Sequence, residues 1–138
     1  MEMVYKENPD RTDALFLEQE LMRFNASRVK DYAYEDFLIK VLDEPGEILG
    51  GVQGQAGGGW LYIQSLWVRR DHRGKGMGRR LLDLAEKQGI NKKCHGAYLY
   101  TYTFQAQEFY EKSGYRVFGK LDRFCGSHAR LFMKKDLH

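Results

Sequence analysis

The sequence is poor in the features that mark secreted, membrane-spanning and metal-binding proteins. Its two cysteines, Cys94 and Cys125, lie far apart without a C-x-x-C spacing, so we expect free thiols in a reducing compartment. The four histidines show no metal-ligand spacing, and we expect no metal. No apolar run approaches the roughly 20 residues of a membrane helix, and the N-terminus is polar rather than signal-like. These absences favour a cytoplasmic protein without a membrane partner.

Positive charge is concentrated in one stretch of the chain. The formal net charge is only +3, which argues against general coating of nucleic acid and for a focused anion site. A chain of 138 residues with 43% hydrophobic and 14% aromatic residues can build a real core. We therefore expect one folded domain, residues 1–138.

Residues 61–89 join an apolar strand to an amphipathic helix through a loop of arginine and glycine. The run LYIQSLWV, residues 61–68, is typical of a strand buried on both faces. From Met77, hydrophobic residues recur at helical spacing, and Gly89 is expected to end the helix. The loop between them therefore leads into a helix N-terminus.

That loop is suited to an anionic ligand. The first amides of a helix are unpaired and carry partial positive charge, and Gly74, Gly76 and Gly78 would let a ligand approach them. Six of the twelve residues from Arg69 to Arg80 are cationic, against one acid, Asp71. The stretch indicates a pyrophosphate site; a solvated turn whose charges serve solubility is the alternative.

Two runs carry a resemblance to a known family. The run Arg73–Gly78, RGKGMG, is neither a Walker loop nor a dinucleotide fingerprint, because Arg79 or Leu81 stands where the third glycine belongs. It resembles the Arg/Gln-x-x-Gly-x-Gly/Ala signature of the GNAT superfamily of acyl-CoA-dependent N-acetyltransferases. Residues 106–115, AQEFYEKSGY, are similar to the Ala-x-x-Phe-Tyr-x-x-x-Gly-Phe/Tyr run of many members.

Periodicity and turn residues predict an α/β fold (α+β by some schemes) with a mixed sheet of about seven strands flanked by helices. The expected strands are residues 3–5, 37–42, 47–55, 61–68, 97–101, 115–121 and 129–133. The expected helices run from a cap at Asp10 or Thr12 to about Arg28, from 77 to 89, and from 105 to 113. Strands 61–68 and 97–101 should be parallel. The order β-α-β-β-β-α-β-α-β-β looks like the GNAT arrangement.

The resemblance implies direct transfer of an acetyl group from acetyl-CoA to a primary amine in a ternary complex. It implies that the backbone N–H of Val68 faces the thioester oxygen, and that Tyr110 is the general acid for the leaving thiolate. A packed helix aromatic is the alternative for Tyr110. The residues expected to bind the cofactor are Leu66, Trp67, Val68, Arg73, Gly74, Lys75, Gly76, Met77, Gly78, Arg79, Phe104, Phe109 and Tyr110.

The general base and the acceptor stay open. Many family members carry a glutamate on the strand before the loop, but this strand has Gln64 and Ser65. Glu35, Asp36, a water chain or an amine that arrives neutral are the alternatives. The acceptor is a small-molecule or peptide amine, and a homodimer is possible by resemblance.

Two rival functions are compatible with the sequence. A non-catalytic or weakly active acyl-CoA-binding or regulatory module of the same fold would keep the loop and lose the transfer step. A nucleic-acid-binding protein would use the cationic cluster and the aromatic residues, but the modest net charge and the lack of a nucleic-acid motif argue against it.

Overall fold

The computed structural model describes residues 1–30 and 32–138, which divide into the units Met1–Ala33 and Tyr34–His138. The first unit holds helix α1 (Arg11–Arg28), whose N-cap is Asp10, one of the two predicted caps. The Asp10 carboxylate accepts a hydrogen bond of 3.0 Å from the backbone N–H of Thr12 and so satisfies one free amide of the first turn.

The strand expected at residues 3–5 is wrong. Met3, Val4 and Tyr5 are exposed and irregular. A three-residue run between charged Glu2 and Lys6 has β-forming side chains, but a strand also needs a paired neighbour, and no strand of the described residues pairs with it. The described sheet therefore has six strands rather than seven.

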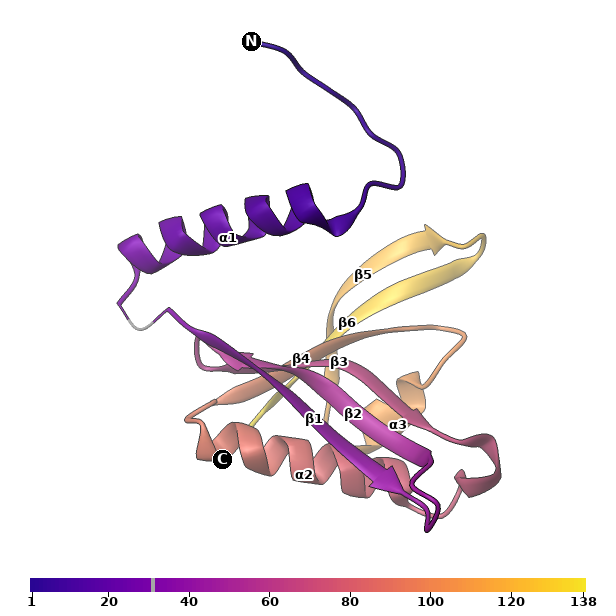
Figure 1. Cartoon of the computed structure of the whole chain (residues 1–138). Helices are drawn as coiled ribbons and strands as arrows, with labels where there is room; N and C mark the ends of the chain where they lie inside the picture. Colours follow the sequence, from indigo (N-terminus) through magenta and orange to yellow (C-terminus); the bar gives the residue numbers. More distant parts are fainter. Residues whose placement is uncertain (31) are drawn as a thin grey trace. The chain divides into compact units, whose positions relative to one another are not determined.

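The second unit is a mixed sheet with helices against one face (Figure 1). Its strands lie in the order β1-β2-β3-β4-β6-β5, and β3 and β4 are parallel, as predicted, while the other pairs are antiparallel. In chain order the elements are β1 (Tyr34–Leu42), β2 (Ile48–Gly57), β3 (Trp60–Val68), the short helix η1 (Arg70–His72), α2 (Met77–Asn91), β4 (Gly96–Tyr102), α3 (Gln107–Lys112), β5 (Arg116–Phe124) and β6 (His128–Asp136).

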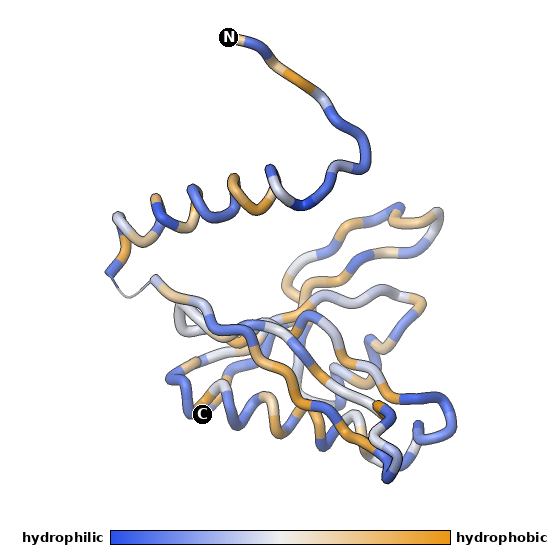
Figure 2. Tube along the Cα trace, in the orientation of Figure 1, coloured by the Kyte–Doolittle hydropathy of each residue, from blue (hydrophilic) through white to orange (hydrophobic). Residues whose placement is uncertain are grey.

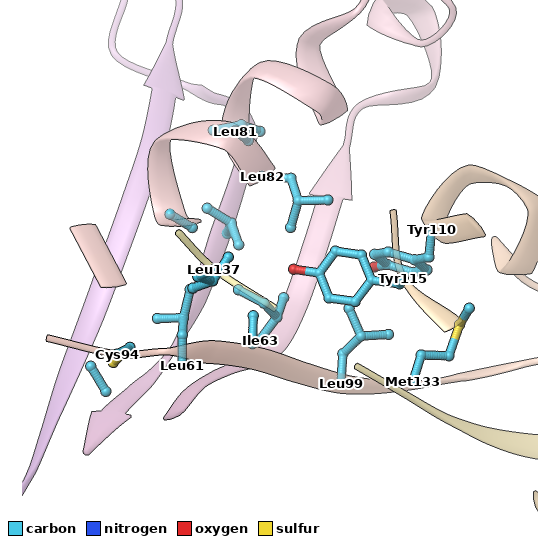
Figure 3. Packing of buried hydrophobic residues seen from close by; sticks show 14 of the residues in the cluster. Leu61, Ile63, Leu81, Leu82, Cys94, Leu99, Tyr110, Tyr115, Met133 and Leu137 are labelled. Atoms are coloured by element: carbon cyan, nitrogen blue, oxygen red, sulfur yellow. The ribbon is translucent and has the colours of Figure 1, made fainter. Parts of the chain in front are cut away.

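The core lies between the sheet and the two helices. Alternate residues of the central strands face α2 and α3, since successive side chains of a strand point to opposite faces. Ile63 of β3 and Leu99 of β4 meet Leu82 of α2, which is fully buried (Figure 3). The opposite face of β3 and β4 is mostly aromatic, and we call it the aromatic face; it carries Trp60, Tyr62, Tyr98, Tyr100 and Tyr102.

Helix α2 continues past Gly89 to Asn91, which corrects the predicted end. Gly89 is there for close packing: a Cβ at this position would lie 3.1 Å from Cδ2 of Leu61. The left-handed residue that follows the helix is Lys93, with φ +65°, and Cys94 donates a backbone hydrogen bond of 2.9 Å to the Gly89 carbonyl. A glycine near a helix end can thus mark contact with a strand rather than the helix end.

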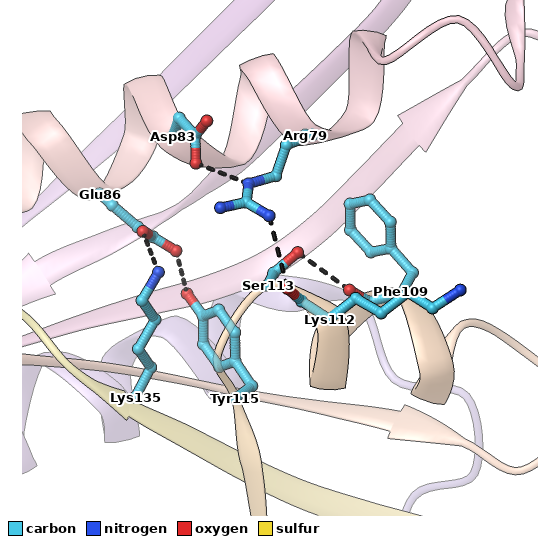
Figure 4. Close-up of polar contacts among 8 residues, drawn as sticks. All are labelled: Arg79, Asp83, Glu86, Phe109, Lys112, Ser113, Tyr115 and Lys135. Carbon is cyan, nitrogen blue, oxygen red and sulfur yellow. Dashed lines mark hydrogen bonds and ion pairs between the residues drawn. The ribbon is translucent and has the colours of Figure 1, made fainter.

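A buried polar network fixes the C-terminal strands to α2 (Figure 4). Glu86 accepts hydrogen bonds from the Tyr115 hydroxyl at 2.9 Å and from Lys135 Nζ at 2.7 Å. Burial first, and then the Glu86 carboxylate, raise the pKa of Tyr115 well above its usual range. Because a buried carboxylate is stabilised only when it is fully partnered, these bonds hold Tyr115, and the start of β5, at one position on α2.

Candidate functional site

The central feature of the site is the separation of β3 from β4. Their parallel pairing ends at Ile63 and Leu99, while β3 runs on to Val68 and β4 to Tyr102. One extra residue, Gln64, bulges from β3 where its register with β2 shifts. The strands enclose a cavity of about 290 Å³, called here the splay cavity, lined by Gln64, Ser65, Leu66, Tyr100, Tyr102, Gln105 and Tyr110.

Backbone groups of β3 face this separation. The N–H of Arg69 donates to the Leu49 carbonyl at 2.7 Å, which makes that pair a hydrogen-bonded one. Hydrogen-bonded and non-hydrogen-bonded pairs alternate along an antiparallel ladder, so the next pair, Gly50 and Val68, is non-hydrogen-bonded. The N–H and C=O of Val68 therefore point away from β2, toward the side that β4 has left.

The second cavity lies at the N-terminus of α2. Its volume is about 410 Å³, and we call it the loop cavity. The loop that borders it is a hydrophilic stretch between β3 and α2 (Figure 2). Gly76 precedes the helix in a left-handed conformation, φ +83°, and its carbonyl accepts from the N–H of Arg80. The earlier amides of the first turn remain available to an anion. The lining is Leu66, Val68, His72, Arg73, Gly74, Gly76, Met77, Gly78, Arg79, Ala106, Phe109 and Tyr110.

The six cations of the loop region are not equivalent. Arg73 lines the loop cavity, and its Nε donates to the Val68 carbonyl at 2.8 Å. Arg79 lines it too, and its Nε bonds Asp83 on the next turn at 3.0 Å.

Arg69 is neutralised within the loop by Asp71. It forms a two-pronged pair with Asp71, at 2.7 and 3.1 Å. Hydrogen bonds from Arg69 and then His72 hold the pKa of Asp71 well below its usual range. Of the six cations, Arg73 and Arg79 line the loop cavity, and Arg79 is itself ion-paired with Asp83.

Tyr110 lies where the two cavities meet, because it and Leu66 line both. Its ring packs edge-on against Phe109 and Tyr115, with centroids 5.2 and 5.9 Å away. Burial raises the pKa of Tyr110 to about 12. The hydroxyl is therefore protonated at neutral pH.

The structure brings together ten of the thirteen residues expected at the cofactor site and leaves three elsewhere. Trp67 lies half-exposed on the other face of β3 and lines a separate hollow with Leu38 and Ile48. Phe104 stacks on Tyr102, with centroids 5.0 Å apart, and is half-exposed. Lys75 is exposed and does not line the loop cavity.

Neither Glu35 nor Asp36 lies near the splay cavity. Glu35 pairs with Lys92, just beyond the C-terminal end of α2, whereas the loop cavity lies at its N-terminal end. The Asp36 carboxylate accepts from Gln55, whose register partner on β3 is Tyr62, before the strands separate. Both carboxylates are held at the opposite end of the sheet.

Several residues of the site were missed from the sequence. His72 and Ala106 line the loop cavity, and Tyr100, Tyr102 and Gln105 line the splay cavity. The signal for the tyrosines was the alternation in YLYTY, residues 98–102, where Leu99 and Thr101 are buried and the tyrosines occupy the other face. In the part of the chain that the structure describes, no cluster of His, Cys, Asp or Glu could hold a metal ion, and no helix is long and apolar enough to span a membrane.

Comparison with known proteins identifies the family. Residues 2–115 match the model of the Acetyltransferase (GNAT) family, and the chain belongs to that family. It is therefore an acetyltransferase, an acyltransferase enzyme.

The relatives agree with this family. The Acetyltransferase Atu2258 of Agrobacterium fabrum is 30% identical over 115 residues, 83% of this chain and 84% of that one. The Blasticidin-S acetyltransferase of Streptomyces morookaense is 40% identical over 75 residues, 54% of this chain and 55% of that one.

Solved structures share the fold. The crystal structure of an acetyltransferase from Bacillus cereus has a TM-score of 0.83 and 33% identity, with 99% of this chain and 100% of that chain covered. An aminoglycoside 6'-N-acetyltransferase complexed with coenzyme A has a TM-score of 0.66 at 20% identity, with 88% and 78% covered. The second likeness shows the fold alone.

The buried phenol of Tyr110 predicts a loss of stability at high pH. In the unfolded chain a tyrosine ionises near pH 10, and in the folded protein Tyr110 ionises near 12. As the pH rises above 10 the unfolded state loses this proton first, so stability present below pH 10 is lost progressively up to pH 12. Over that interval Tyr110 accounts for about 2 to 3 kcal/mol.

Urea unfolding of the wild type and Tyr110→Phe between pH 8 and pH 11.5 measures this effect. The free energy of unfolding should fall more steeply with pH in the wild type, because both proteins share every other titrating group. Equal slopes would show that the Tyr110 phenol titrates alike in the folded and unfolded chain.

Proposed function

We propose that this protein transfers the acetyl group of acetyl-CoA to a primary amine by direct attack in a ternary complex. The observation that carries the proposal is the meeting of the two cavities at Leu66 and Tyr110, beside the backbone that β4 leaves unpaired. A donor can occupy the loop cavity while an acceptor occupies the splay cavity, and their reacting atoms can meet without either passing through the core.

The loop cavity fits the diphosphate and pantetheine portions of acetyl-CoA. Anionic oxygens would be held by the free amides at the start of α2, next to Arg73 and Arg79, where a helix N-terminus favours negative charge. The pantetheine arm would extend along β3 at Leu66, whose outward backbone groups can pair with its amides. At Val68 the carbonyl already accepts from Arg73, which leaves the N–H for the thioester oxygen. Membership of the acetyltransferase family supports this assignment of the donor.

The chemistry follows from the groups around the junction. The amine nitrogen attacks the thioester carbon, the C–N bond forms, and the carbonyl oxygen gains negative charge that the N–H of Val68 can stabilise. One preorganised donor of this kind contributes about 3 to 4 kcal/mol in related acyl chemistry. The C–S bond then breaks as the carbonyl re-forms, and the sulfur takes a proton from the Tyr110 hydroxyl. The amine's surplus proton leaves through the polar lining of the splay cavity, and a proton from water restores the Tyr110 hydroxyl.

The raised pKa of Tyr110 is compatible with this role. A phenol with a pKa of about 12 is a weaker acid than a thiol in water, whose pKa is about 8.5. The desolvation that raises the tyrosine pKa also raises that of a thiolate formed beside it, because both are anions leaving water. Tyr110 can therefore donate a hydrogen bond to the sulfur throughout the step and transfer the proton as the C–S bond breaks.

A panel of amines with acetyl-CoA tests the proposed activity. Purified protein is mixed with acetyl-CoA and amino acids, polyamines, aminoglycosides or short peptides, and free thiol and acetylated product are followed together. Thiol release matched by product identifies an acetyltransferase. Tight acetyl-CoA binding without product from any amine would instead identify the non-catalytic module, and strong salt-dependent binding to DNA or RNA with none to coenzyme A would exclude both.

Removing the Tyr110 hydroxyl should impair turnover rather than donor binding. In Tyr110→Phe the ring still packs against Phe109 and Tyr115, but the departing sulfur loses its proton donor. We expect kcat to fall on the order of 100-fold, while the acetyl-CoA dissociation constant changes little. Steady-state kinetics with calorimetric titration of acetyl-CoA separate the two effects, and an unchanged kcat would remove Tyr110 from the mechanism.

Gly76 should be required for donor binding. Its φ of +83° is strained for any residue other than glycine. A Cβ at this position would meet no protein atom within 4 Å, and it would lie at the edge of the loop cavity that we assign to the diphosphate. Alanine in this conformation costs about 1 to 2 kcal/mol, and the loop can relieve that cost only by leaving the conformation that presents its amides. Gly76→Ala should therefore weaken acetyl-CoA binding about ten-fold or more.

A glycine outside the site supplies the matched control. Gly46, in the turn between β1 and β2, has φ +94° and equally open surroundings. Gly46→Ala imposes the same backbone strain, and calorimetric titration should find its acetyl-CoA affinity unchanged. If both variants lose affinity equally, the effect of Gly76→Ala is global destabilisation and not loss of the anion site.

A further inference from the structure

Arg130 is a cation that lies next to two residues of the splay cavity. It lies on β6, opposite Tyr102 of β4, and its guanidinium carbon is 3.6 Å from the ring centroid of Tyr100. Tyr100 and Tyr102 both line the splay cavity. Within residues 1–30 and 32–138, Arg130 makes no ion pair, and its buried Nε has no hydrogen-bond partner. The Nε atom is covered by its neighbours, so an incoming acceptor oxygen would meet the terminal N–H groups of the same guanidinium.

Few acids lie around Arg130. On β5, the other neighbour of β6, Asp122 follows Leu121, the register partner of Arg130, and its carboxylate pairs with Lys120 at 3.2 Å. The strands β2, β3 and β4 contain no aspartate or glutamate, and Asp136 on β6 pairs with Gly96, at the opposite end of β4 from Tyr102. The nearby side chains are phenols rather than carboxylates. Burial, followed by the neighbouring Tyr100 and Tyr98, raises the pKa of Tyr62 to about 12, so this phenol stays neutral near pH 7.

The charge pattern discriminates between classes of amine. A polyamine or a polycationic sugar binds where carboxylates face it, and here it would meet an unpaired arginine. A guanidinium that stacks on an aromatic ring keeps its N–H groups free to bind a carboxylate in a two-pronged geometry. The same tyrosines provide flat walls for an acceptor between its amine and its anionic end.

We propose that the acceptor is an amine that also carries a carboxylate, and that Arg130 is the specificity-determining residue that binds this carboxylate. The proposal rests on the acetyltransferase function of the same site and adds the chemical class of its substrate. The amine reaches the junction at Tyr110 from the splay cavity, and the carboxylate stays at Arg130 on the aromatic face of the sheet. The separation of Tyr110 and Arg130 then determines which distance between amine and carboxylate the acceptor must have.

A series of ω-amino acids tests this assignment and measures that distance. Glycine, β-alanine, 4-aminobutyrate, 5-aminovalerate, 6-aminohexanoate and 4-(aminomethyl)benzoate are each compared with their carboxamides as acceptors, with acetyl-CoA as donor. At the best length, kcat/KM for the acid should exceed that for the amide by about ten-fold or more, as expected for a charge-assisted pair. The difference should lie mainly in KM for the acceptor.

Two substitutions at Arg130 and one control complete the experiment. Arg130→Met keeps a long side chain against Tyr100 and should abolish the preference for acids, whereas Arg130→Lys keeps the charge and should retain part of it. Lys134→Met removes the neighbouring cation of the same strand face, which lies over Phe118, and should change nothing. Calorimetric titration of acetyl-CoA and thermal unfolding check that each variant is folded and binds the donor.

The outcomes separate this inference from the proposed function. An acid preference that disappears in Arg130→Met and persists in Lys134→Met supports the inference. Transfer to acids and amides at equal rates, transfer only to amines outside the series, or an acid preference that Arg130→Met retains would overturn it and leave the acetyltransferase function standing. Failure of every amine, within the series and in the wider panel, would overturn both.

Discussion

The site depends on one backbone constraint, the end of hydrogen bonding between β3 and β4 after Ile63 and Leu99. Beyond that point each strand follows its other neighbour: β3 stays paired with β2, and β4 with β6. Backbone groups that would complete a sheet are left facing a space between two strands that are themselves held firmly. Such groups are obligatory hydrogen-bonding partners, so the interrupted sheet is ready to bind a ligand with amides of its own.

The same separation gives the two faces of the sheet a common opening. On the helical face, Tyr110 is held by its packing against Tyr115, which Glu86 fixes in turn. On the aromatic face, Tyr100 and Tyr102 border the opening and Arg130 covers one of them. The two substrates can therefore approach from opposite faces, and a buried polar network remote from the loop helps to set the geometry at their meeting point.

The parts of the site that could be predicted are those encoded by adjacent residues. The loop from Arg73 to Gly78 and the flanking β3 and α2 carry local signals, namely glycine, charge and a change of period. The splay cavity depends on strand order, which brings Arg130 beside Tyr100 from 30 positions away, and no local pattern encodes that pairing. The errors have the same origin: residues 3–5 have strand-forming side chains but no partner, and Gly89 serves a contact with Leu61 rather than a helix end.

The distribution of charge bears on the missing general base. A carboxylate base in the splay cavity would pair with Arg130 or with the cations of the loop, and its pKa would fall, which would make it a poor proton acceptor. The cavity instead offers Gln64, Ser65 and tyrosine hydroxyls, which can relay a proton through water. An acceptor that reaches such a site as a free amine needs no base before attack, only a path for the proton released afterwards. The absence of acids from β2, β3 and β4, and an Arg130 that pairs with no acid of the described residues, are then two consequences of one arrangement. This arrangement favours a neutral amine at one end of the acceptor and an anion at the other.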